Sequence, residues 1–154
     1  MKIDLIVANA LGRTPENLLA KDYATRASAI GARLALGPVG IVEVESRKAN
    51  RDAEGEALLA AAAGARLILC DERGKAYSSR AFSDRLCHWR DGGERRLAFI
   101  VGGADGHGDA LRAAATETLA FGPQTWPHAL VRVMLAEQVY RAISIAAGTP
   151  YHRD

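Results

Sequence analysis

The stretch RRLAFIVGG, residues 95–103, decides the fold class. It is a short, almost continuous apolar run that ends in two glycines, and a run of this length bounded by turn residues is typical of a strand buried on both faces. A second run of the same kind, RLILC at 66–70, lies upstream of it. Fully buried strands of this type occur mainly in parallel sheets, whose connections are usually helices.

Working outward from these two strands, strand-like and helix-like segments alternate along the whole chain. Further strands are predicted at Lys2–Ala10, Ile41–Ser46 and Glu117–Phe121, and the charged segment 71–79 is predicted to be a loop. The alternation predicts an α/β fold with a mostly parallel sheet flanked by helices, in a single domain spanning residues 1–154. Helices are predicted over 14–34 with Thr14 as the N-cap, from about Asp52 to Gly64, over 78–93 with Ser78 or Ser79 as the cap, in a short piece within 104–126, and over 127–148.

Composition limits the function classes. Hydrophobic residues make up 49% of the chain and the formal net charge is only +2, so a nucleic-acid surface would have to be local. Cys70 and Cys87 form neither a CxxC pair nor a zinc-type spacing, which indicates reduced thiols and no metal site. The N-terminus lacks a signal-peptide pattern, and no apolar run reaches the length of a membrane span. We therefore expect a cytoplasmic protein without a membrane segment.

Three loops follow the predicted strands at the edge where open α/β sheets bind ligands. They are DERGK at 71–75, GGADGHG at 102–108 and FGPQTW at 121–126. The glycine spacing fits neither GxGxxG nor a P-loop, which makes a dinucleotide or triphosphate site a weak hypothesis. The backbone of the third loop is suited to a flat base such as adenine, while simple turns without a ligand remain open for all three.

The last helix, at 127–148, carries its few polar side chains on two separate facets. His128 and Arg132 share one facet by their i,i+4 spacing, and Glu137 and Arg141 share another and are expected to pair. The rest of the helix is apolar, which indicates either complete burial in one chain or a symmetric dimer interface.

Four motifs together carry a resemblance to a known family. They are CDERGKAYSSRAF at 70–82, FIVGGADG at 99–106, PHALVRVMLAEQVYRA at 127–142 and the terminal PYHRD at 150–154. In this combination and order the chain resembles the ribosomal RNA large subunit methyltransferase H family, SPOUT-class enzymes that methylate a pseudouridine in bacterial large-subunit ribosomal RNA. The resemblance covers essentially the whole chain and is strongest from Leu67 to Asp154.

The resemblance implies a trefoil-knotted α/β fold, a homodimer and S-adenosylmethionine as cofactor. This chain differs from related sequences at Cys70, where an aliphatic residue is common, and in the segment FGPQT, where leucines are common. Both changes are tolerable if the cofactor is held mainly by backbone atoms. By position, the implied cofactor contacts fall on Cys70, Gly102, Gly103, Phe121, Gly122, Pro123, Gln124, Thr125 and Trp126.

Related sequences also end in Tyr-His-Arg and an acidic residue, which makes the tail of this chain a candidate catalytic segment that reaches the partner's pocket. We expect His152 to act as the base for the imide proton of N3, Arg153 to stabilise negative charge and Tyr151 to stack on the base. A reaction with no dedicated base is the alternative. Contacts to RNA or cofactor are expected from His128, Arg132 and Arg141.

The small net charge favours a structured target, so we expect the substrate to be the assembled ribosome or its large subunit. Three alternatives remain open: a methyltransferase of the same class that acts on transfer RNA or another ribosomal site, a nucleotide-binding oxidoreductase, and a ribosome-binding protein without catalytic activity.

Overall fold

The computed structural model describes residues 1–46, 50–103 and 106–153. Its strands form one five-stranded sheet in the order β2-β1-β4-β3-β5. Every pairing between neighbouring strands is parallel, which confirms the predicted sheet type. The strands are β1 (Lys2–Ala8), β2 (Val39–Val44), β3 (Arg66–Ala76), β4 (Arg96–Val101) and β5 (Glu117–Ala120).

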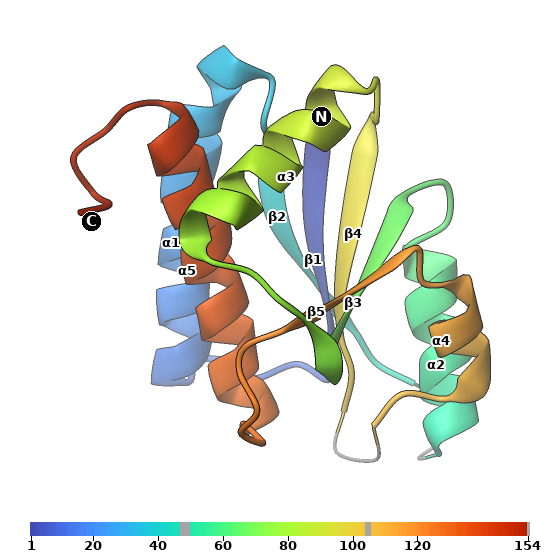
Figure 1. The fold of residues 1–154 in the computed structure, drawn as a ribbon. Coiled ribbons are helices and arrows are strands. Elements are labelled where there is room, and N and C mark those ends of the chain that lie inside the picture. The colour runs from blue at the N-terminus through green and yellow to red at the C-terminus, as the bar shows by residue number, and fades with distance from the viewer. Residues whose placement is uncertain (47–49, 104–105, 154) are drawn as a thin grey trace.

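Helices cover both faces of the sheet (Figure 1). One core cluster joins β1, β3 and β4 to α1, α3 and α5, and a second joins the opposite face to α2 and α4. Among the described residues, no helix combines the length and the apolarity needed to cross a membrane. The helices are α1 (Pro15–Gly31), followed by a 3-10 turn (Ala32–Leu34), α2 (Arg51–Ala61), α3 (Ser79–Asp91), α4 (Asp109–Ala114) and α5 (His128–Ala146).

Local sequence signals set the helix ends. The Thr14 hydroxyl accepts a hydrogen bond from the amide of Asn17, and Ser78 caps α3 in the same way, as the sequence predicts. Gly148 follows α5 with a φ of +66°, a left-handed conformation that glycine adopts without strain, so the helix ends there. The tail after Gly148 therefore leaves α5 in a defined direction.

Strand β2 begins earlier than predicted, at Val39 instead of Ile41. The reason is a polar contact outside the strand, because the Val39 amide donates to the Ser28 hydroxyl of α1 at 2.8 Å. Val39 also pairs with Ile3 of β1. The contact with α1 and the pairing with β1 together hold the start of β2.

The largest departure from the sequence prediction is β3, because residues 71–76 belong to the strand and not to a loop. Leu119 of β5 pairs with both Cys70 and Lys75, so the residues between them form a large bulge. A Cβ on Gly74 would lie 2.7 Å from backbone atoms of Leu119, so only glycine permits this close approach. The charged side chains of the bulge hid the strand continuation. The knotted threading stays a prediction.

Candidate functional site

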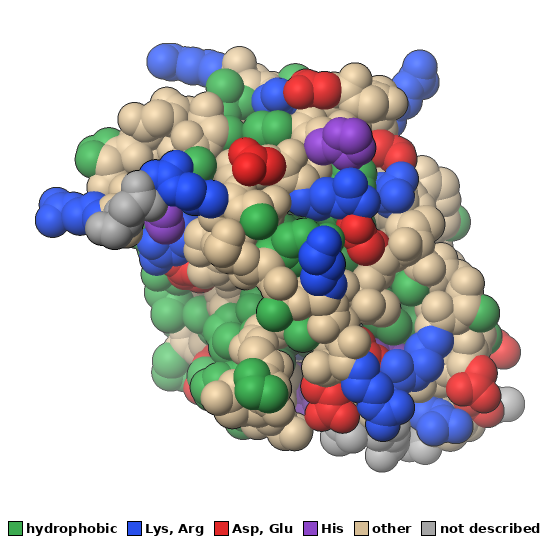
Figure 2. Space-filling model, viewed as in Figure 1, with side chains coloured by type: hydrophobic (Ala, Val, Ile, Leu, Met, Phe, Trp, Pro, Cys, Tyr) green, Lys and Arg blue, Asp and Glu red, His purple; other side chains and the backbone are tan. Residues whose placement is uncertain are grey.

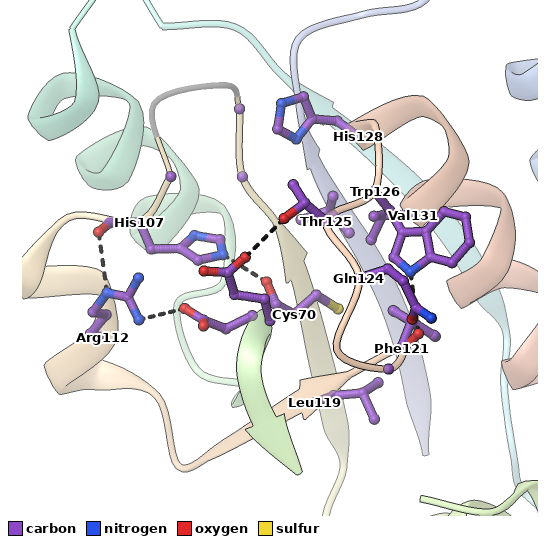
Figure 3. A pocket seen from close by; sticks show the side chains of 17 residues that line it. Cys70, His107, Arg112, Leu119, Phe121, Gln124, Thr125, Trp126, His128 and Val131 are labelled. Atoms are coloured by element: carbon purple, nitrogen blue, oxygen red, sulfur yellow. Dashed lines mark hydrogen bonds and ion pairs between the residues drawn. The ribbon is translucent and has the colours of Figure 1, made fainter. Parts of the chain in front are cut away.

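The three segments predicted as loops meet around one cavity of about 260 Å³, which lies at the bulge of β3 and at the carboxyl ends of β4 and β5 (Figure 3). All but one of the residues expected at a cofactor site line it, the exception being Pro123. The lining residues are Cys70, Asp71, Glu72, Val101, Gly102, Gly103, Gly106, His107, Arg112, Leu119, Phe121, Gly122, Gln124, Thr125, Trp126, His128 and Val131.

One side of the cavity is apolar and aromatic. It is formed by Leu119, Phe121, Trp126 and Val131, and the Trp126 indole N–H donates to the Phe121 carbonyl at 3.3 Å. That hydrogen bond restricts the indole ring although the residue itself is exposed. A flat ring system is the kind of ligand such a surface accommodates.

The opposite side is polar and begins with His107. Its Nε2 lies 2.7 Å from the Cys70 carbonyl oxygen, and since a carbonyl only accepts, Nε2 must carry the proton. Its Nδ1 is buried without a hydrogen-bond partner among the described residues. Burial lowers the pKa of His107, so the ring is neutral at neutral pH. His107 therefore ties the loop after β4 to the end of the apolar part of β3.

Asp71 and Arg112 continue this polar side. Burial alone would raise the pKa of Asp71, but the amide of Arg73 and the positive charge of Arg112 outweigh it, so the pKa is lowered. Arg112 forms an ion pair with Asp71 and also donates to the His107 carbonyl. The cavity thus has a fixed carboxylate and a guanidinium facing its aromatic side.

Two glycines bring the backbone close to the cavity. A Cβ on Gly102 would lie 2.7 Å from the His107 ring, and a Cβ on Gly103 would lie 2.5 Å from a Glu54 carboxylate oxygen. The Gly103 amide donates to the other Glu54 oxygen at 2.8 Å, so α2 holds this loop in place. Larger residues at either position would push the loop away from its neighbours.

Cys70 contacts the polar side of the cavity through its backbone carbonyl, which accepts from His107. The thiol is buried, and burial together with the charge of Asp71 raises the pKa of Cys70 to about 12. A thiol in that environment is not a nucleophile at neutral pH. This agrees with the expectation that an aliphatic residue could replace it.

The structure contradicts the expected RNA contact at Arg132. Its side chain is buried, at 2% exposure, and its guanidinium pairs with Glu43 of β2 at 3.0 Å. It also donates to the carbonyls of Ala8 at 3.2 Å and Asn9 at 2.8 Å. All these partners belong to the β1 and β2 ends, so Arg132 joins α5 to the sheet. His128 on the same helix is exposed and lines the cavity.

The tail follows the C-terminal end of α5 (Figure 1), whereas the cavity is lined by His128 and Val131 near the start of this helix. After Gly148 the tail folds back along α5, where Tyr151 contacts Glu137 and His152 contacts Arg141. Tyr151, His152 and Arg153 do not line the cavity of their own chain. Asp154 lies outside the described residues.

A network on α5 holds the tail. The Tyr151 hydroxyl donates to Glu137 Oε1 at 3.0 Å, and Arg141 donates to the same oxygen through Nε at 2.9 Å and Nη2 at 2.5 Å. The predicted pairing of Glu137 with Arg141 is thus confirmed. The Arg141 guanidinium also lies 4.8 Å from the centre of the Tyr151 ring.

Sequence reasoning missed part of the polar side. The sequence places Asp71, Glu72 and His107 in candidate ligand loops but gives none of them a role, and Arg112 lies outside those loops. The available signal was position, because Asp71 directly follows a buried strand and His107 lies inside the glycine-rich loop. Arg112 could be found only from the fold, which brings this residue of α4 to Asp71 in the bulge of β3.

A parallel sheet with a glycine-lined cavity at its carboxyl edge defines an α/β protein that binds a small, partly aromatic ligand there. The family model described as "Predicted SPOUT methyltransferase" matches residues 1–152, and the chain belongs to the SPOUT methyltransferase family.

Relatives agree with this assignment over their whole lengths. The chain is 57% identical to "Ribosomal RNA large subunit methyltransferase H" of Caulobacter vibrioides over 154 residues, covering 100% of this chain and 99% of that protein. It is 58% identical to the protein of the same name from Phenylobacterium zucineum, with 100% of both chains covered. A crystal structure of a probable methyltransferase from Bordetella pertussis is similar in fold, with a TM-score of 0.52 at 13% identity, covering 92% of this chain and 96% of that one.

Proposed function

We propose that this protein methylates N3 of a pseudouridine in large-subunit ribosomal RNA, with S-adenosylmethionine as the methyl donor. The observation that carries the proposal is the cavity itself, which gathers the bulge of β3 and the loops after β4 and β5 in a chain of the SPOUT family. Full-length identity to proteins named as large-subunit ribosomal RNA methyltransferases supports the choice of substrate.

The cavity fits this cofactor chemically. The aromatic side suits an adenine ring, and the carboxylates of Asp71 and Glu72 suit the positive charges of a sulfonium and an ammonium group. Arg112 provides a cation for the carboxylate of the amino-acid part. When bound, the cofactor supplies a methyl group on a sulfonium, which an aligned nucleophile can accept without a metal.

We further propose that the functional unit is a homodimer in which each tail completes the partner's site. The placement of the tail supports this arrangement, since Tyr151 and His152 pack against Glu137 and Arg141 of α5 and neither lines the cavity of its own chain. Exposed apolar side chains near the start of α1 and α5 supply a surface for a second copy, with Leu18 at 54% exposure, Leu19 at 44% and Leu130 at 41%.

A mixing experiment tests the shared site. Gly102→Val disables the cavity and His152→Ala disables the tail, so neither variant alone should transfer methyl groups. In a mixture, half of the dimers combine both chains, and each of these has one site with an intact cavity and an intact tail. We expect about a quarter of the wild-type activity to return. No recovery, with mixed dimers demonstrated by differential tagging, would show that each chain completes its own site.

The charge distribution supports a structured ribosomal target. On the face of the molecule seen in Figure 2, basic side chains are interspersed with acidic ones, and the net charge of the chain is only +2. Such a surface binds free RNA weakly, because non-specific affinity depends on many phosphate contacts. We propose that the substrate is the assembled ribosome or its large subunit. We also propose that the protein acts in the cytoplasm and that the whole chain forms one catalytic domain. Exposed His128 is a candidate RNA contact in place of Arg132.

The direct test uses S-adenosylmethionine with a labelled methyl group and ribosomes that lack this modification. Ribosomes with pseudouridine at the target should be labelled at that nucleotide, and ribosomes with uridine there should not. Labelling of transfer RNA instead would replace the proposed substrate. Stabilisation of the protein by NADH but not by S-adenosylmethionine in a thermal unfolding assay would contradict the cofactor.

A further inference from the structure

The tail is held in one arrangement by two elements of its own chain. The Tyr151 ring lies 4.5 Å from the Tyr140 ring of α5, and Tyr140 in turn contacts Tyr23 of α1 at 5.7 Å, as measured between ring centres. The Tyr151 hydroxyl is bound by Glu137. Burial and these partners raise the pKa of Tyr151, so its hydroxyl stays protonated and remains a donor. Because Tyr151 is held in this way, the position of the next residue, His152, is also restricted.

Arg141 determines which nitrogen of His152 carries the proton. Its Nη1 lies 3.3 Å from His152 Nδ1. A guanidinium has only N–H donors and stays protonated in proteins, so Nδ1 must be the accepting nitrogen. Neutral imidazole has a single accepting nitrogen, and the proton is therefore on Nε2. Glu137 fixes the guanidinium through two hydrogen bonds, so this assignment follows from side chains that are themselves held.

We propose that His152 serves the reaction as a hydrogen-bond donor through Nε2–H and not as a general base. This inference rests on the proposed function and names the role of one residue in it. A base would need a lone pair on the nitrogen that faces the substrate, and the contact with Arg141 places the only lone pair on the other nitrogen.

The proton balance of the step follows. Hydroxide from solvent removes the imide proton of N3 and becomes water, and the negative charge that remains spreads over N3 and the two flanking carbonyl oxygens. Nε2–H of His152 donates to one of these oxygens and stabilises the anion. The charged and titratable groups that the network on α5 brings to His152 include Arg141, which contacts it, and Glu137 and Tyr151, which contact Arg141; Tyr23 and Arg26 of α1 lie behind them against Tyr140.

Two substitutions separate the roles. His152→Gln keeps an N–H group at about the distance of Nε2 but has no basic nitrogen, whereas His152→Ala removes both. We expect turnover to fall by no more than about tenfold in His152→Gln and by about a hundredfold in His152→Ala. His88→Ala, which removes an exposed histidine of α3, is the control for the loss of an imidazole elsewhere and should match wild type.

The pH dependence gives a second readout. With a donor at position 152, turnover rises with pH beyond neutrality as hydroxide becomes available, and it does so in wild type and His152→Gln alike. An imidazole base would instead make the wild-type rate level off near pH 7. Such a plateau, together with His152→Gln as inactive as His152→Ala, would overturn the inference.

A third readout does not depend on activity. Two-bond ¹H–¹⁵N spectra of the uniformly ¹⁵N-labelled protein, assigned with the His152→Gln variant, report which imidazole nitrogen is protonated. We expect the Nε2–H form for His152 at pH 7.5. The Nδ1–H form would overturn the donor role even in an active enzyme. Absence of methyl transfer by wild type would count against the proposed function alone.

Discussion

Arg132 and Arg141 lie on the same helix, and each pairs with a glutamate, yet the two pairs do different things. Arg132 pairs with Glu43 of β2 and reaches the carbonyls that end β1, so its contacts hold two elements together. Arg141 pairs with Glu137 four residues earlier on α5, which leaves its Nη1 for the tail. A partner on another element contributes to the stability of the fold, while a partner on the same helix orients a side chain for chemistry.

The comparison is tested most strongly at Arg132. Arg132→Met removes one member of a buried pair and leaves Glu43 and two carbonyls without their donor. We expect the free energy of unfolding to fall by about 3 kcal/mol, measured by urea denaturation monitored by circular dichroism. Arg33→Met, at an exposed arginine, is the matched control and should change it by less than about 0.5 kcal/mol. A loss as small as the control's would mean that Arg132 does not join α5 to the sheet.

The next largest effect is expected at Gly74, in the bulge of β3. Gly74→Ala places a Cβ against the backbone of Leu119, which cannot move without breaking the β3–β5 pairing. We expect a loss of about 2 kcal/mol in the free energy of unfolding, from the same denaturation curves. Gly93→Ala offers a comparison, because its strain comes from a φ of +86° with no atom near the new Cβ. If Gly74→Ala proves as stable as wild type, the two strands are not this close.

How much the sequence predicts differs between these regions. Apolar runs and glycines marked β4 and the first half of β3, because burial on both faces leaves a local pattern. The second half of β3 has the composition of a loop, and only its pairing with Leu119 makes it a strand. Pairing between distant segments leaves no signal in the charged sequence of the bulge itself.

The site shows the same limit. Glycines and the FGPQTW loop could be assigned from the sequence because a turn needs those residues. The i,i+4 spacing of His128 and Arg132 predicted a shared surface, but Arg132 faces Glu43, which is far away in the chain. Helical spacing says which residues are neighbours on a helix and not what lies opposite them. The separation of tail and cavity likewise required the length and direction of α5.

The comparison is sharpened at Arg141, where we expect a change in activity with little change in stability. Arg141→Met keeps an apolar stem against Tyr151 but removes the donor to His152 Nδ1, so both proton positions on the imidazole become accessible. Turnover should fall about tenfold, while the free energy of unfolding changes by less than about 1 kcal/mol. Methyl-transfer kinetics and urea denaturation on the same preparation measure both. A loss of stability equal to that of Arg132→Met would erase the distinction between the two arginines.

The smallest expected effect is a change in stability with pH, and it concerns His107 at the cavity. As in His152, a hydrogen bond to a neighbouring group determines which ring nitrogen of His107 carries the proton. Because the pKa of His107 is lowered by burial, the unfolded chain binds a proton at this residue more readily than the folded one. Stability from this residue is therefore present above the ordinary imidazole pKa of about 6.5 and is lost as the pH falls below it.

The variant His107→Leu removes this dependence of stability on pH but leaves the Cys70 carbonyl without its donor. We expect the variant to have a lower Tm than wild type at pH 7.5, and we expect this difference in Tm, measured by calorimetry, to become smaller at pH 5.5. A gap that stays constant across this range would mean that the folded protein accommodates the charged imidazole, which the buried Nδ1 makes unfavourable.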